Sequence, residues 1–80
     1  MDMKRAFHDT IAAAVRGGMP EGQPGDGLGL AHLRSMSERI TDDFSQAKLG
    51  RWLGWAQCAV VAAGCATLDD MKEINRQHAG

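Results

Sequence analysis

The chain has 80 residues and a formal net charge of −1, from nine basic and ten acidic side chains. A chain of this length forms one domain, and its balanced charge argues against strong non-specific binding to nucleic acid. We therefore expect residues 1–80 to form a single helical domain. Disulfides, a metal or oligomerisation usually stabilise so small a fold.

The first two of these remedies find no support in the sequence. Cys58 and Cys65 would lie about 10 Å apart on one helix, too far for a disulfide. They are best explained as small buried side chains. No group of Cys, His and carboxylate residues has the spacing of a zinc site. The sequence therefore predicts no metal or cofactor. Assembly into a homo-oligomer becomes the favoured way to stabilise so small a fold.

Two features bear on localisation. Residues 1–16 carry charges throughout and lack the apolar core of a signal peptide. The longest apolar run, residues 58–66, is too short to span a bilayer. With two free thiols, we expect a protein of the reducing cytoplasm, inside a host cell, with no membrane partner.

The periodicity of apolar residues predicts an all-α fold, a small bundle of three or four helices. The expected helices cover about residues 2–16, 29–43, 46–63 and 67–78. Phe7, Ile11, Ala14 and Val15 form the apolar stripe of the first helix, and Gly17-Gly18 ends it.

A linker rich in glycine and proline follows the first helix. Residues 17–29 hold six of the ten glycines and both prolines. Such a loop is either a mobile connection or a ligand-binding loop. The segment 25–29 could cradle a phosphate, but it lacks the preceding strand and the Gly-Lys-Ser/Thr of a P-loop. We therefore favour a connection, long enough to let the first helix pack on its own chain or on another subunit.

The second and third helices are expected to be separated by a break near residues 41–45. Leu30, Leu33, Met36 and Ile40 form one apolar row in the second helix. Ser45 is a plausible N-cap for the third helix. The alternative is one long helix that runs through Asp42-Asp43.

The third helix is apolar on more than one side, which is typical of a helix at the centre of a fold or of an assembly. Leu49, Leu53, Ala56 and Val60 belong to its main stripe. Small residues form a second row, and the glycines in it suggest that another helix crosses closely. We predict a partner or oligomer interface made of Gly50, Arg51, Gly54, Trp55 and Cys58.

The two tryptophans of this helix diverge by about 60°. Trp52 fits the apolar stripe and is expected in the core. Trp55 is either buried as well, the simpler expectation, or exposed as a binding residue. In the fourth helix, Thr67 and Asp70 predict a capping box.

No catalytic pattern is visible, and we expect no enzyme. The three histidines lie on different segments, and no serine or cysteine is visibly paired with a base. Two binding alternatives stay open: a small DNA-binding regulator that uses the fourth helix, and an oligomeric sponge for a signalling nucleotide. The possible anion or nucleic-acid contacts are Arg34, Arg39, Lys72, Asn75 and Arg76, with Arg51 a further candidate for the nucleotide.

Residues 48–76 resemble the C-terminal segment of small, mostly uncharacterised proteins from tailed phages and prophages. The resemblance rests on Arg51-Trp52-Leu53-Gly54-Trp55, Gln57, Gly64, Thr67-Leu68-Asp69, Met71-Lys72 and Ile74-Asn75-Arg76. It implies a phage accessory protein that acts stoichiometrically, by binding a host protein, a defence complex or a defence signalling nucleotide. We therefore expect a non-enzymatic helical protein that binds a host factor and inhibits a host anti-phage defence.

Overall fold

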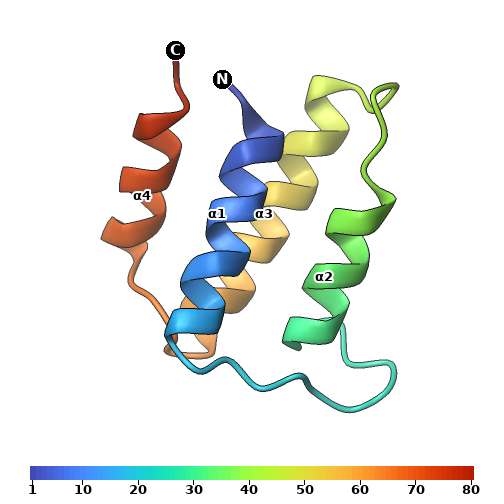
Figure 1. Cartoon of the computed structure of the whole chain (residues 1–80), viewed down its shortest axis with the longest axis vertical. Coiled ribbons are helices and arrows are strands. Elements are labelled where there is room, and N and C mark those ends of the chain that lie inside the picture. Colours follow the sequence, from blue (N-terminus) through green and yellow to red (C-terminus); the bar gives the residue numbers. More distant parts are fainter.

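The computed structural model describes all 80 residues and consists of four helices. They are α1 (Met3–Arg16), α2 (Leu30–Arg39), α3 (Gln46–Ala62) and α4 (Leu68–Gln77). Figure 1 shows that α1 and α3 run in one direction and α2 and α4 in the other. The predicted all-α bundle is confirmed. None of the helices has both the length and the hydrophobicity that a bilayer crossing requires.

The central helix is α1. It packs against each of the other three helices, and the remaining helix pairs touch far less. In Figure 1, α2 and α4 flank α1 and α3 lies behind it. The small residues Ala6, Thr10 and Ala14 are fully buried, so neighbours approach α1 closely on several sides. In this structure α1 therefore packs against the other helices of its own chain.

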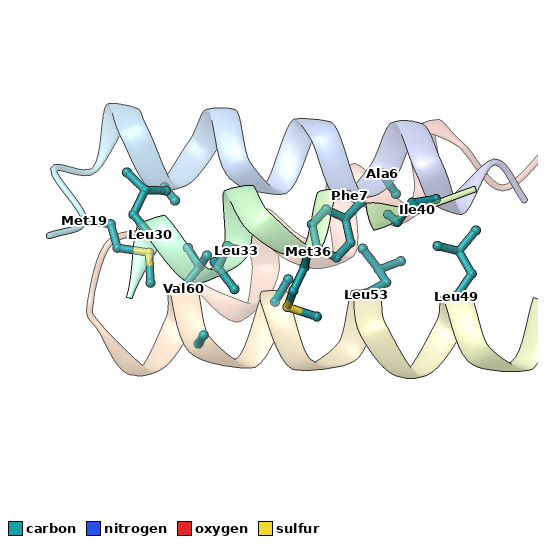
Figure 2. Packing of buried hydrophobic residues seen from close by; sticks show 13 residues of the cluster. Ala6, Phe7, Met19, Leu30, Leu33, Met36, Ile40, Leu49, Leu53 and Val60 are labelled. Atoms are coloured by element: carbon teal, nitrogen blue, oxygen red, sulfur yellow. The ribbon is translucent and has the colours of Figure 1, made fainter. Parts of the chain in front are cut away.

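One apolar core fills the space between α1, α2 and α3 (Figure 2). Phe7 lies at its middle and is fully buried. Leu49, Leu53 and Val60 of the predicted α3 stripe are buried there too. In the predicted stripe of α1, Phe7 and Ala14 are buried as expected, but Val15 is 50% exposed. The buried side of α1 includes Ala6, Thr10 and Ala13 in its place.

The helix ends use the capping residues that the sequence predicts. Ser45 Oγ accepts a hydrogen bond of 3.0 Å from the amide of Lys48. Thr67 and Asp70 form a complete capping box. Hydrogen bonds from the backbone and then the side chain of Thr67 lower the pKa of the Asp70 carboxyl below its usual 3.8. Gly18 and Gly64 adopt left-handed backbone just after α1 and α3, where a side chain would cause strain.

The second helix ends earlier than predicted. It stops at Arg39, and Ile40 takes extended backbone while its side chain is buried. Thr41 then closes a turn, because its hydroxyl donates to the Asp43 carboxylate and its carbonyl accepts from the Phe44 amide at 3.2 Å. Thr and Asp favour such turns over helix interiors. The predicted break before Ser45 is confirmed, and the long-helix alternative is wrong.

The linker folds back against the start of α2. The carbonyls of Pro20 and Glu21 accept hydrogen bonds of 3.0 and 3.1 Å from the amides of Leu30 and Ala31. A Cβ on Gly29 would lie 2.3 Å from the Glu21 carbonyl oxygen, so only glycine allows this approach. The amides of Leu30 and Ala31 at the start of α2 are therefore already paired within the chain.

Candidate functional site

A groove between α2 and α3 gathers the residues best suited to bind a ligand. It has a volume of about 370 Å³. We call it the α2–α3 groove, and it is lined by His32, Met36, Arg39, Arg51, Trp52 and Trp55. Basic or imidazole groups and two indoles make up most of this lining, and no carboxylate belongs to it.

The two tryptophans sit in the groove because they lie three residues apart on α3. Trp52 is half-buried against the core and packs edge to face on Phe44, with ring centroids 4.9 Å apart. Trp55 is 49% exposed, and its Nε1 donates a 2.9 Å hydrogen bond to the Gly27 carbonyl. That bond fixes the exposed ring against the linker. Burial of both tryptophans was the simpler expectation, and it is wrong for Trp55.

Cations surround the indole of Trp52. The guanidinium carbon of Arg39 lies 5.4 Å from the Trp52 ring centroid, and its Nε donates to the Ser35 carbonyl at 3.3 Å. Lys48 Nζ lies 5.5 Å from the same centroid. Such cation–π contacts hold a cation in place without neutralising it.

Arg51 is the freest cation of the groove. It is exposed and belongs to none of the ion pairs of the chain. Arg34, in contrast, forms an ion pair with Glu21 and lines a different hollow with His8. The structure therefore brings Arg39 and Arg51 together with Trp55, and it places Arg34 elsewhere.

The predicted contacts on α4 do not join this groove. Figure 1 shows α4 on the far side of α1 from α2. Arg76 forms an ion pair with Glu73, whereas Lys72 is exposed and has no ion pair. Asn75 is occupied by Gln57: the two amides exchange hydrogen bonds of 2.8 and 3.1 Å.

This amide pair belongs to a polar cluster that the sequence analysis missed. Gln57 also donates to the hydroxyl of Thr10 at 3.3 Å, and that hydroxyl donates to the Ala6 carbonyl at 2.8 Å. The cluster joins α1, α3 and α4 across 47 and 18 residues of sequence. The only signal in the sequence is Gln57, the one polar side chain in the apolar stretch from Trp52 to Ala62.

A second polar contact closes the end of the bundle. His78 Nε2 lies 2.7 Å from Asp9 Oδ2, and the His78 carbonyl accepts from the Asp2 amide at 2.8 Å. The histidine is more enclosed than its partner, with 18% of its side chain exposed. The pair resembles half of a catalytic triad, but no hydroxyl or thiol is hydrogen-bonded to this histidine, so it ties the C-terminus to α1.

The interface predicted on α3 is only partly free. Gly54 and Cys58 are exposed, whereas Gly50 is half-buried and a Cβ there would lie 3.6 Å from the sulfur of Met3. The predicted burial of both cysteines is wrong, since Cys58 is exposed and Cys65 is half-buried. The side chain of Cys58 points away from the core because Ala56, Ala59 and Val60 occupy the core-facing positions of that turn.

No three side chains of His, Cys, Asp or Glu gather where they could hold a metal ion. The groove offers cations and indole faces, which are groups that can hold an anionic group beside an apolar or planar one. No protein-family model, curated protein or solved structure matches the chain.

Proposed function

We propose that this chain is a non-enzymatic, phage-type binding protein that acts stoichiometrically on a host protein through the α2–α3 groove. The specific target class is a component of a host anti-phage defence. The observation that carries the proposal is the lining of the groove, two indoles among Arg39, Arg51 and His32 with no carboxylate. The resemblance of residues 48–76 to phage accessory proteins supports the host setting, which is the reducing cytoplasm.

The groove suits an acidic segment of a partner protein. Arg51 has no partner in the chain and can bind a carboxylate through two parallel hydrogen bonds. Trp55 offers a large, half-exposed ring that is already held by Gly27 and loses little freedom on binding. Arginine and tryptophan are the residues most enriched at binding hot spots.

A signalling nucleotide is the second candidate, and the same lining favours it. Its base would stack on an indole while Arg39 and Arg51 pair with phosphate. Screening cyclic nucleotides by thermal shift separates the two ideas, because a tight ligand raises the melting temperature by mass action. If a nucleotide raises the melting temperature of the wild type but not of Arg51→Ala, the ligand of the groove is a nucleotide and not a host protein.

DNA binding through α4 has less support from the geometry. Asn75 and Arg76 are engaged within the chain, and Asp69 and Asp70 lie in the first turn of the helix. A mobility-shift assay at low salt tests it, and a shift at micromolar protein would favour DNA over a protein partner.

The direct test of the groove compares two arginine variants. Arg51→Ala removes a groove cation, whereas Arg5→Ala removes an exposed arginine of α1 and serves as the control. Loss of a charge-assisted hydrogen bond costs about 1.5–3 kcal/mol, or roughly 10- to 100-fold in affinity. We expect that loss for the captured host protein with Arg51→Ala only. Equal affinity of both variants would contradict the groove as the site.

Trp55→Ala tests the aromatic half of the groove. The variant keeps the core, because the ring is half-exposed, and it loses the contact to Gly27. We expect host binding to weaken at least about tenfold, as for a hot-spot tryptophan. A folded Trp55→Ala protein with full activity against its target would remove this residue from the site.

A further inference from the structure

The basic character of the α2–α3 groove continues beyond its lining, to Lys48 in the first turn of α3. Lys48 Nζ lies 4.1 Å from the ring centroid of Phe44 and 5.5 Å from that of Trp52. The guanidinium carbon of Arg39 lies 5.4 Å from the same Trp52 centroid. Two cations, one in the groove and one beyond it, therefore lie against a single indole.

Lys48 has no counter-ion in the chain. It is half-buried and belongs to none of the ion pairs. Asp43 precedes α3, but its carboxylate accepts from the Thr41 hydroxyl and forms no ion pair. The neighbouring Asp42 forms none either. A charge that loses part of its hydration is normally compensated by one of opposite sign. Aromatic rings alone contact this ammonium group, so its charge is available to an external anion.

The position of Lys48 does not favour the fold. The backbone dipoles of a helix give its N-terminus a partial positive charge, so a cation in the first turn is disfavoured. The first turn of α3 also has no acidic residue, and its cap is the neutral hydroxyl of Ser45. The lysine therefore adds positive charge to an end of the helix that is already electropositive, which favours an anion there.

Lys48 shares one face of α3 with the binding residues of the groove. We define the basic–aromatic face as Lys48, Arg51, Trp52 and Trp55. These residues lie at i, i+3, i+4 and i+7, which places them on one side of the helix. The face is about 10 Å long. Its two cations come first along α3 and its two indoles follow.

We propose that Lys48 is a further binding residue of this site, and that the host segment it binds carries two acidic side chains beside an apolar or aromatic one. This inference rests on the proposed function and specifies its partner. Arg51 pairs with one acidic group and Lys48 with the other. The apolar side chain lies on the exposed ring of Trp55. A segment with a single carboxylate would leave one of the two cations without a partner.

Intrinsic fluorescence reports on this face, because both tryptophans of the chain lie on it and the chain has no tyrosine. The probes are three capped peptides of equal length, with two glutamates, one glutamate and one glutamine, or two glutamines beside a phenylalanine. We expect a saturable change in tryptophan emission with the two-glutamate peptide. The one-glutamate peptide should bind about two- to fivefold more weakly, as for loss of an exposed ion pair, and the glutamine peptide more weakly still. No change in emission with the two-glutamate peptide would overturn the proposal.

Lys48→Gln tests the assignment of the second acidic group. The matched control is Lys72→Gln, which removes an exposed lysine of α4 that also has no ion pair. Lys48→Gln should lower the affinity for the two-glutamate peptide to that for the one-glutamate peptide, whose own affinity should stay unchanged. Lys72→Gln should change neither affinity. Equal weakening of both peptides by Lys48→Gln, or of neither, would overturn the pairing.

Thermal unfolding separates binding from a structural role of Lys48. Glutamine and lysine have similar helix propensities, and the substitution removes a cation from the first turn of α3. We expect the melting temperature of Lys48→Gln to stay within about 2 °C of the wild type. A larger fall with unchanged peptide affinity would assign the lysine to the fold and overturn the proposal.

This inference and the proposed function can fail separately. Against the captured host protein, Lys48→Gln should weaken binding about two- to fivefold, and Arg51→Ala should weaken it further. Full affinity of Lys48→Gln together with loss of binding by Arg51→Ala would overturn the role of Lys48 alone. Full affinity of both variants would overturn the groove as the binding site.

Discussion

The two sides of α3 satisfy their polar groups in opposite ways. Towards α1 and α4, Gln57 exchanges hydrogen bonds with Asn75 and donates to the hydroxyl of Thr10. Towards α2, the exposed Arg51 and Trp55 leave a guanidinium and an indole face open to solvent. A polar side chain that is paired within the chain stabilises the fold, whereas an unpaired one is available to a partner.

This difference assigns roles that residue type alone does not. Asn75 and Arg51 both read as candidate contacts in the sequence. Asn75 is hydrogen-bonded to Gln57 in the contact between α3 and α4, whereas Arg51 belongs to no ion pair of the chain. Substitutions can therefore perturb the contact between α3 and α4 and the α2–α3 groove separately.

The largest expected effect on stability comes from truncating Met71, the only buried residue of α4. Met71 is 2% exposed, so Met71→Ala should cost about 2–5 kcal/mol of unfolding free energy through lost burial and a cavity. Chemical denaturation measures it. Leu28→Ala is the control, since that side chain is 51% exposed and its loss should cost less than about 0.5 kcal/mol. Similar costs for the two variants would contradict the packing of α4.

The amide pair comes next. Asn75→Ala leaves the half-buried Gln57 without its main partner and should cost about 1–3 kcal/mol of stability. A double-mutant cycle with Gln57→Ala should return a coupling energy of about 0.5–3 kcal/mol. Additive effects would show that the two amides do not depend on each other. Host binding should stay intact in the folded Asn75→Ala protein.

A change on the outer side of α3 should act in the opposite direction. Gly54→Ala replaces a helix-weakening residue at a position with open space, and should raise monomer stability by about 0.5–1 kcal/mol. Denaturation of dilute protein measures this gain. A loss of stability would mean that the space around Gly54 is filled.

The smallest effect concerns pH. The folded-state pKa of Asp70 is lowered, so the unfolded chain takes up this proton at a higher pH than the native one. The stability from Asp70 is therefore fully present above its ordinary pKa of 3.8 and is lost as the pH falls through the lower folded value. Asp70→Asn should flatten the fall in stability below about pH 5. An unchanged acid profile would argue against the capping box.

The sequence predicts what depends on local patterns. The four helices follow from apolar spacing, and Ser45, Thr67 and Gly64 mark three of their ends correctly. The early end of α2 at Arg39 was missed, because the burial of Ile40 continues the apolar row after the helix has stopped.

Local sequence patterns do not predict contacts between segments that are distant in the sequence. The pairing of Gln57 with Asn75, and of His78 with Asp9, depends on how α1, α3 and α4 pack. The exposure of Trp55 depends on where α2 and the linker lie. The sequence predicts the groove in part, because Arg39, Arg51 and Trp55 are all candidate binding residues, but it does not place them together.

The most direct measurement compares two double variants in a quantitative pull-down from host lysate. Arg39→Ala with Arg51→Ala empties the α2–α3 groove of its arginines, whereas Lys72→Ala with Arg76→Ala removes two cations from α4. The groove variant should lose the host protein that the wild type captures, and the α4 variant should retain it. Retention by the groove variant, or loss by the α4 variant alone, would contradict the assignment of binding to the groove.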